Sequence, residues 1–232
     1  MSKYRIQTCK SRLWYVEDYL VPSLLAQGIA DSDIRVWLDE NEDGNLLSCM
    51  KSFYDTLGED DEITWYLQDD VIICSDFKVR TESFADIFDD MVVCGFCSNY
   101  QDSKNVAEKG VCDKIHMWYS FPCIGIPNHV ANGCAHWFFN YVTKNTTYNV
   151  YVNSRRMDDT LFWIYLQDFS DVKRVVNCVP NLVDHIDYLI GGSVTNKIRE
   201  RKIVRSSYWE EPELVNELER RLKDEGGGIF RK

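Results

Sequence analysis

Apolar side chains recur in the first third of the chain at spacings that predict three strands alternating with two helices. The predicted strands span residues 4–8, 34–38 and 63–68, and the predicted helices span residues 12–27 and 46–57. The first helix carries its apolar face on Leu13, Val16, Leu20, Leu24 and Leu25, and Gly28 ends it. This order of elements is typical of a parallel sheet with right-handed crossovers, in which ligands bind at the carboxyl ends of the strands.

Weaker patterns follow in the rest of the chain. We expect helices over residues 83–89, 128–142, 158–167 and 211–224, and strands over residues 91–97, 148–152 and 172–178. Asn128 and Asp158 are favourable N-cap residues, and the last helix carries its apolar stripe on Leu214, Leu218 and Leu222. Residues 98–126 mix turn residues with aromatic ones, which favours a loop that covers a ligand. Together the elements predict an α/β fold: a mostly parallel central sheet flanked by helices, with a C-terminal helical tail.

The composition is that of a folded protein. Of the 232 residues 45% are hydrophobic and 13% aromatic, which is enough for a sizeable core in one domain. No run of about eighteen apolar residues occurs, and the start of the chain lacks the apolar core of a secretory signal, so we expect a cytoplasmic protein that does not enter a membrane. Nine cysteines, an odd number, are spread through predicted helices and strands and are expected to be reduced thiols.

The formal net charge of −11 disfavours a polyanion or an anionic membrane as a partner for the surface as a whole. The charge is uneven, however. Between positions 197 and 205 one acid, Glu200, stands against five basic residues, which are Lys197, Arg199, Arg201, Lys202 and Arg205. Two interpretations of this basic segment stay open, a local site for anions and a solvated surface turn.

The predicted strand 63–68 runs directly into two adjacent carboxylates, Asp69 and Asp70. Hard cations such as Mn2+ and Mg2+ prefer oxygen ligands, and the carboxyl ends of strands in an open α/β sheet are where nucleotides bind. The pair therefore predicts a site for a divalent cation beside a diphosphate. The alternative is that both residues only end the strand and cap a turn.

Four segments, in this order, resemble nucleotide-sugar glycosyltransferases of the GT-A fold, and in particular small members encoded by bacteriophages. Residues 67–71, Leu-Gln-Asp-Asp-Val, are similar to the metal-binding Asp-x-Asp motif of that fold. Residues 156–161, Arg-Met-Asp-Asp-Thr-Leu, are similar to the acidic motif that opens the helix beside the acceptor. Residues 180–185 are similar to the late segment in which many members supply a metal-ligating histidine, and residues 190–193 precede the basic segment.

The resemblance covers roughly residues 1–205 and implies a GT-A-like, Rossmann-like catalytic domain there. Its nucleotide-binding half would span residues 1–100 and its acceptor half residues 101–205, and residues 206–232 would form a C-terminal helix and tail. The implied activity is that of a metal-dependent transferase with Mn2+ or Mg2+ as cofactor and a nucleoside-diphosphate sugar as donor, with UDP favoured. Such an ion would neutralise the charge of the departing diphosphate as the bond to the sugar breaks.

The resemblance also implies roles for single residues. Asp39 would lie near the nucleobase, Asp69 near the ribose or the metal, and Asp70 and His185 on the metal. Further candidates for donor contacts are Thr8, Arg12, Arg155, Arg156, Lys197 and Arg199. One departure from the family pattern is Gln68, which stands where the motif has its first carboxylate, so the contact expected there would fall to Asp69.

Asp158 and Asp159 have two interpretations. Both are good N-cap residues for the helix that follows. Alternatively, one of them is the general base that deprotonates the acceptor hydroxyl in an inverting displacement, and we then favour Asp159. A retaining enzyme would need no such base. His185 is either a satisfied core histidine or a metal ligand in a loop beyond the last strand.

Cysteines offer a rival site. Cys94 and Cys97 have the spacing of a thiol redox pair or of half a zinc site, and the residues that follow are Cys112, His116, Cys123, Cys134 and His136. Structural zinc needs four ligands at short spacings, whereas these spacings are irregular and Cys94 lies within a predicted strand. A zinc or redox site is therefore the weaker interpretation.

These observations favour transfer of a sugar from a nucleoside diphosphate to a hydroxyl group. Phage enzymes of this activity often modify hydroxymethylated pyrimidines in DNA, which have to be extruded or reached, and the basic segment could meet the DNA backbone. A protein, a glycan or a small molecule is the other class of acceptor, which the acidic charge slightly favours. Two alternatives are a metal-dependent nucleotidyltransferase, although residues 8–12 contain no glycine for a phosphate loop, and a non-catalytic nucleotide-binding module.

Overall fold

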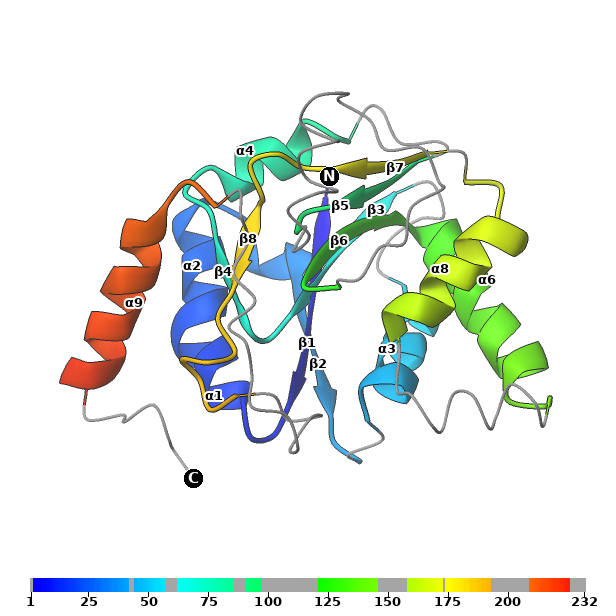
Figure 1. Ribbon diagram of the computed structural model, residues 1–232, viewed down its shortest axis with the longest axis horizontal. Helices are drawn as coiled ribbons and strands as arrows, with labels where there is room; N and C mark the ends of the chain where they lie inside the picture. Colours follow the sequence, from blue (N-terminus) through cyan, green and yellow to red (C-terminus); the bar gives the residue numbers. More distant parts are fainter. Residues whose placement is uncertain are drawn as a thin grey trace.

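A six-stranded sheet forms the centre of the computed structural model, which describes residues 2–41, 44–56, 62–85, 91–96, 121–145, 158–172, 174–192 and 209–225 (Figure 1). The strand order is β2-β1-β3-β6-β5-β7. The strands are β1 (Lys3–Cys9), β2 (Ile34–Asp39), β3 (Ile63–Gln68), β5 (Met91–Cys94), β6 (Cys123–Pro127) and β7 (Arg174–Asn177). All of these run parallel except β6, which is antiparallel to both of its neighbours. The prediction of a mostly parallel α/β sheet is confirmed.

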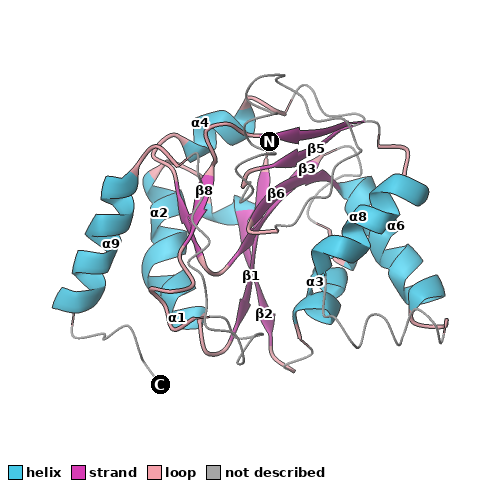
Figure 2. Cartoon of the chain, viewed as in Figure 1, coloured by secondary structure: helices cyan, strands magenta, loops and turns pink. Residues whose placement is uncertain are grey.

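Helices cover both faces of this sheet (Figure 2). One face carries the helical segment 13–26, α4 (Phe77–Glu82) and α9 (Pro212–Asp224), and the other carries α3 (Asn45–Tyr54), α6 (Asn128–Trp137) and α8 (Asp158–Asp168). Each set of helices shares a cluster of buried apolar side chains with the strands. The protein therefore has three layers, with a core on each side of the sheet. Within the described residues, no helix has the length and apolar character needed to cross a membrane.

The first helical segment contains a wide turn. It consists of α1 (Leu13–Tyr15), the π-helical turn η1 (Val16–Leu20) and α2 (Val21–Ala26). Pro22 at the start of α2 has no backbone N–H to donate, and the π turn lies directly before it, where a regular α-helical bond would be lost. The segment ends as predicted, at Gly28, whose φ of 78° suits glycine.

Two predicted apolar stripes differ from the buried stripes of the structure. Leu25 is 40% exposed, because the inserted π turn shifts the later residues around the helix axis relative to a 3.6-residue repeat. In α9 the buried stripe consists of Val215, Leu218 and Leu222, whereas Leu214 is only partly buried. This stripe packs onto the same core cluster as the first helical segment.

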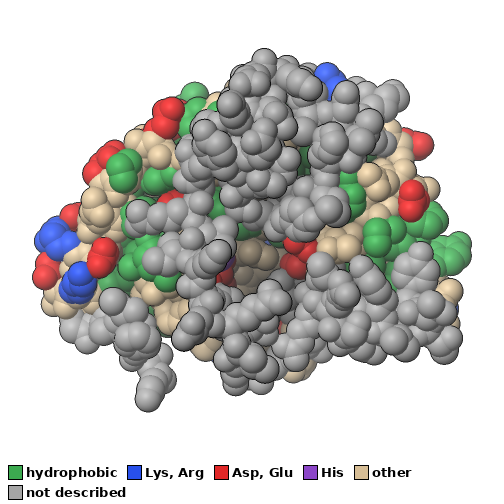
Figure 3. All heavy atoms as spheres, viewed as in Figure 1, with side chains coloured by type: hydrophobic (Ala, Val, Ile, Leu, Met, Phe, Trp, Pro, Cys, Tyr) green, Lys and Arg blue, Asp and Glu red, His purple; other side chains and the backbone are tan. Residues whose placement is uncertain are grey.

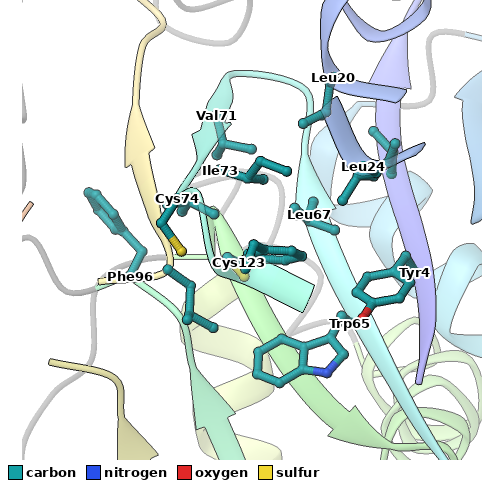
Figure 4. Close-up of a cluster of buried hydrophobic side chains, with 14 of the residues drawn as sticks. Tyr4, Leu20, Leu24, Trp65, Leu67, Val71, Ile73, Cys74, Phe96 and Cys123 are labelled. Carbon is teal, nitrogen blue, oxygen red and sulfur yellow. The ribbon is translucent and has the colours of Figure 1, made fainter. Parts of the chain in front are cut away.

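The core on the side of the first helix fixes the position of β3 (Figure 4). Side chains of Tyr4, Leu24, Leu67 and Val71, from four different elements, are buried together in it. The Tyr4 hydroxyl pairs with the hydroxyl of Thr81 at 2.8 Å, and burial raises the pKa of Tyr4 to about 12. Since β3 is buried on both of its faces, the turn that follows it has a fixed place at the edge of the sheet.

A small second sheet follows that turn and was not predicted. It pairs β4 (Val71–Ile73) with β8 (Val183–His185) in antiparallel register, with Val71 opposite His185. Each strand is three residues long, so the sequence pattern alone is too short to reveal it. The pairing brings a segment near residue 185 onto the edge where the acidic pair lies.

Several other boundaries differ from the prediction. Helix α4 begins after Asp76 and buries Phe77 and Thr81, which lie one helical turn apart. Residues 83–85 form a turn, so the helix expected over residues 83–89 does not begin at residue 83, and its residues 86–89 lie outside the described residues. The end of the loop predicted over residues 98–126 contains the start of β6, which pairs with β3 and β5. The strand expected over residues 148–152 lies outside the described residues.

The remaining elements are confirmed with small shifts. Helix α6 continues into the π turn η3 (Phe138–Val142), so that together they span the predicted residues 128–142. Helices α3 and α8 and strands β5 and β7 lie within one to three residues of their expected ends.

Candidate active site

Asp69 and Asp70 form the turn between β3 and β4, at the carboxyl end of β3. They are 8% and 9% exposed, so neither is a solvated turn residue. Parallel pairing aligns Gln7 with Gln68, which brings the end of β1 directly beside this turn. The two carboxylates therefore lie at the sheet edge where open α/β folds bind ligands. Figure 3 shows acidic side chains near the middle of this face of the molecule.

Both carboxylate oxygens of Asp69 accept hydrogen bonds from the protein. The Thr8 hydroxyl donates to Oδ2 at 2.9 Å, and the Cys9 N–H donates to the same oxygen at 3.3 Å. Arg12 Nη1 donates to Oδ1 at 2.9 Å. Asp69 is thus a structural acceptor that ties the end of β1 to the end of β3.

Asp70 is bonded on one oxygen only. Arg12 Nη1 donates to Oδ2 at 2.6 Å, and His185 Nε2 lies 3.2 Å from that same oxygen. The other oxygen, Oδ1, is buried and has no hydrogen-bond partner among the described residues. A buried carboxylate oxygen without a donor is costly, so Oδ1 is the atom of this pair that a bound cation could satisfy.

The β4–β8 pairing positions His185. Besides the register that sets Val71 opposite His185, the Ile186 N–H donates to the backbone carbonyl of Asp70 at 2.8 Å, and Tyr15 donates its hydroxyl to the Val71 carbonyl at 2.9 Å. His185 therefore ends a strand, and the expectation of a loop at this position is wrong. On the far side of the ring, Asp187 Oδ1 lies 3.8 Å from Nδ1, a distance beyond hydrogen-bond range.

The surroundings of Asp69 and Asp70 shift their pKa values in opposite directions. Burial raises the pKa of Asp69, and the neighbouring charge of Asp70 adds to the rise. Burial acts in the same direction on Asp70, but His185 and Arg12 outweigh it and hold the pKa of Asp70 well below its usual range. For Arg12 burial is outweighed by the two carboxylates, which raise its pKa. Asp70 is consequently the more acidic of the two carboxylates.

Asp70 and Asp69 differ in what they could offer a divalent ion, because only Asp70 has an oxygen without a hydrogen-bond partner among the described residues. In the described part of the chain, no group of three or more His, Cys, Asp or Glu side chains is spaced to hold a metal. Mg2+-type sites commonly use only one or two carboxylates and complete their shell with substrate phosphates and water. The unpartnered Oδ1 of Asp70 and the imidazole of His185 are the protein groups that could belong to such a shell. Asp69 has no comparable free oxygen.

Asp39 lies on the same edge of the sheet. It ends β2 and is paired in register with Cys9, whose N–H donates to Asp69. Its carboxylate accepts a hydrogen bond from the Gly44 N–H at 3.1 Å. The position expected for a nucleobase contact is therefore next to the acidic pair across the end of β1.

Asp158 and Asp159 begin α8 on the other side of the sheet. Asp158 is buried, and Asp159 is partly buried and accepts the Thr160 N–H at 2.7 Å. Burial raises the pKa of Asp159. Gln7 of β1 donates to the Ser52 hydroxyl of α3 at 2.5 Å, and α8 packs on α3, so α8 lies on the side of β1 that Gln7 faces. Since Gln7 and Thr8 point to opposite faces, the two acidic groups flank β1 from opposite sides.

Other candidates fall outside the described residues. These are Arg155, Arg156, Lys197, Arg199 and the rest of the basic segment, together with Cys97, Cys112 and His116 of the rival cysteine site. The seven described cysteines are free thiols, as expected, and all but Cys9 are buried. Sequence reasoning missed Tyr15, Asp187 and Gly192, the last of which offers its carbonyl to Arg12. Among these three residues, the sequence gave a hint only of Asp187, because it lies two residues after His185.

Comparisons with known proteins add little. The sequence matches no model of a protein family and no curated protein. Among solved structures, it is similar to the galactosyltransferase LgtC in complex with donor and acceptor sugar analogs, with a TM-score of 0.43 and 12% identity over 77% of this chain and 73% of that one. It is also similar to the glycosyltransferase GlyE of Streptococcus pneumoniae TIGR4, in its apo form (TM-score 0.42, 10% identity over 76% of this chain) and in a second structure (0.41, 10% over 77%). The chain spans 45% of the GlyE chains. Likenesses this low carry no functional argument.

Proposed function

We propose that this protein is a glycosyltransferase that moves a sugar from a nucleoside diphosphate, with UDP favoured, to a hydroxyl group. The observation that carries the proposal is the buried Asp70, whose free Oδ1 and neighbouring His185 lie at the carboxyl end of a central strand. The resemblance of residues 67–71, 156–161 and 180–185 to motifs of nucleotide-sugar glycosyltransferases also supports it, and only residues 156–161 contain neither Asp70 nor His185.

Asp70 and His185 are the residues that would hold Mn2+ or Mg2+. When bound, such an ion offsets the negative charge that develops on the departing diphosphate. Thr8 and the Cys9 N–H keep Asp69 in place beside them. We assign the nucleobase of the donor to the neighbourhood of Asp39. We assign its phosphates to Arg155, Arg156, Lys197 and Arg199.

For an inverting displacement we assign the general base to Asp159. Its carboxylate takes the proton of the acceptor hydroxyl, the oxygen forms a bond to the anomeric carbon, and the electrons of the broken sugar–phosphate bond leave with the diphosphate. The raised pKa of Asp159 supports this choice, because a base works best when its pKa approaches the working pH. Asp158 is the more buried of the two, at 6% exposure in the first turn of α8.

The acceptor that we propose to test first is a hydroxymethylated pyrimidine in DNA. Its support is the likeness to phage enzymes and the rest of the basic segment, Arg201, Lys202 and Arg205, while the net charge of −11 stands against it. Proteins, glycans and small hydroxylated molecules form the comparison set. Transfer to the free hydroxymethylated nucleoside but not to DNA would show that the acceptor is a small molecule.

A thermal-shift series tests the donor. UDP, GDP and their sugars are added with and without Mn2+ to the wild type, to Asp70→Asn and to Asp33→Asn, a control at the opposite end of β2, where Asp33 pairs with Lys3 at 2.6 Å. We expect a UDP-specific rise that needs Mn2+, persists in the control and disappears in Asp70→Asn. At a ligand concentration one hundred times Kd the stabilisation is about 2.7 kcal/mol. A rise with zinc or nucleic acid alone would contradict the assignment.

The products separate the alternatives. A glycosyltransferase, or its slow hydrolysis of the donor, releases a nucleoside diphosphate and a sugar product. A nucleotidyltransferase would release pyrophosphate from a nucleoside triphosphate instead. A binding module would release neither, although it would still show the thermal shift.

A further inference from the structure

Arg12 is locked into the centre of the acidic pair. It sits in the turn from β1 to α1, where its backbone N–H donates to the Cys9 carbonyl at 3.0 Å. One guanidinium nitrogen bonds both carboxylates, Asp69 at 2.9 Å and Asp70 at 2.6 Å. The other nitrogen donates to the Gly192 carbonyl, and the residue is only 4% exposed. Arg12 thus joins three distant parts of the chain through a single buried cation.

In this arrangement both carboxylate oxygens of Asp69 accept hydrogen bonds from the protein. Arg12 takes one of its oxygens, and Thr8 and Cys9 take the other. On Asp70 the guanidinium takes Oδ2 and leaves Oδ1. Arg12 therefore does not compete with a metal for the open oxygen, but it lies beside it and carries the same sign of charge.

The summed charge of Asp69, Asp70 and Arg12 determines how strongly they attract a divalent ion. Asp69, Asp70 and Arg12 sum to −2 + 1 = −1, whereas the two carboxylates alone would present −2. His185, whose Nε2 lies 3.2 Å from Asp70, lowers this negative charge further whenever it is protonated. A divalent ion is accordingly attracted much less than a free acidic pair would attract it. A diphosphate supplies the missing negative charge, and by reciprocity the ion then improves diphosphate binding by the same factor.

We propose that Arg12 is a positioning residue that neutralises the acidic pair from within, withholds Asp69 from the metal and makes binding of the divalent ion depend on the donor diphosphate. The inference rests on the proposed function. It differs from a purely structural role for Arg12 in one respect: removal of the charge strengthens metal binding in the absence of nucleotide, whereas loss of a structural contact weakens it.

The test measures Mn2+ affinity from the EPR signal of the free ion, with and without UDP. The proteins are wild type, Arg12→Gln, Arg12→Lys, which keeps the charge, and Arg5→Gln. Arg5 is the matched control because it is also a buried arginine paired with one aspartate, Asp55, on the opposite face of β1. Circular dichroism confirms that each variant is folded.

In the wild type we expect UDP to raise Mn2+ affinity by about tenfold or more. Arg12→Gln should raise the affinity without UDP by about tenfold, the effect of one charge on a neighbouring divalent ion even with water-like screening, and should reduce the enhancement by UDP to match. Arg12→Lys and Arg5→Gln should stay near the wild type. Unchanged or weaker nucleotide-free affinity in folded Arg12→Gln overturns the inference.

A second variant covers the case in which Arg12→Gln does not fold. Because Asp69 is withheld from the metal, Asp69→Asn should lower Mn2+ affinity in the presence of UDP by less than about tenfold, whereas Asp70→Asn should lower it by about a hundredfold or more. Equal losses in the two variants overturn the inference and leave the proposed function intact. A wild type that binds neither Mn2+ nor UDP overturns both.

Discussion

Replacing Thr8 by valine removes one hydroxyl from the acidic pair and leaves the shape of the strand almost unchanged. Thr8 is 6% exposed and donates to Asp69 Oδ2 at 2.9 Å. Hydrogen bonds to charged groups contribute about 1.5–3 kcal/mol, and the Cys9 N–H at 3.3 Å remains as a second donor to the same oxygen. We therefore expect Thr8→Val to lower the free energy of unfolding by about 1.5–2 kcal/mol at neutral pH.

The loss should depend on pH in a defined direction. Burial raises the pKa of Asp69, and the bond from Thr8 to the ionised carboxylate opposes the rise, so the variant has a still higher pKa at this residue. The stabilisation by Thr8 is present while Asp69 is ionised and is lost as pH falls through its folded-state pKa. Because that pKa lies above the unfolded value, the difference between the two proteins should shrink before unfolded aspartates begin to titrate.

Urea unfolding of both proteins at a series of pH values measures this difference. The control is Thr143→Val, an exposed position whose hydroxyl donates to the Phe139 carbonyl at 2.8 Å. Its effect should be small and independent of pH in the acidic range. A loss in Thr8→Val below about 0.5 kcal/mol at neutral pH, or one that does not shrink on acidification, would refute the reasoning.

Three further predictions concern other parts of the molecule. Asp159→Asn should slow sugar transfer by about 10²- to 10⁴-fold and leave the stabilisation by UDP and Mn2+ unchanged, and a normal rate would remove Asp159 as the base. Burial raises the pKa of Cys49, Cys123 and Cys134 well above the usual value, so these thiols should react with Ellman's reagent only after unfolding. Partly exposed Cys9 should react in the native protein, and peptide mass spectrometry can identify the cysteines that have reacted. In Gly95→Ala the new Cβ would lie 2.5 Å from Cys123 Sγ, so denaturant unfolding should show a loss of about 1–3 kcal/mol, more than for Gly133→Ala, where the end of the Tyr165 side chain can move aside.

Local periodicity was sufficient for the first half of the fold. β1, β2, β3 and the helices between them each carry their own apolar pattern, so their limits could be predicted to within a few residues. The position of Asp69 and Asp70 at a sheet edge then followed from the topology of parallel strands. By contrast, β4, β8 and β6 depend on partners far away in sequence, and strands of three to five residues have too few positions to show a period.

The site could be predicted as a set of residue types but not as a set of contacts. The resemblance pointed to His185, yet the reason that it meets Asp70 is the β4–β8 register, which no local pattern encodes. Arg12 was expected to contact the donor. Its bonds to both carboxylates depend on the direction of one long side chain, which is set by packing rather than by sequence spacing.

The proposed pairing of Asp70 with His185 around a divalent ion is tested most directly by pulsed EPR of Mn2+ bound to the protein together with UDP. The account predicts a coupling between the Mn2+ electron spin and an imidazole nitrogen in the wild type, and its loss in His185→Gln with UDP still bound. Bound Mn2+ and UDP without nitrogen coupling in the wild type, or with the same coupling in His185→Gln, would contradict it.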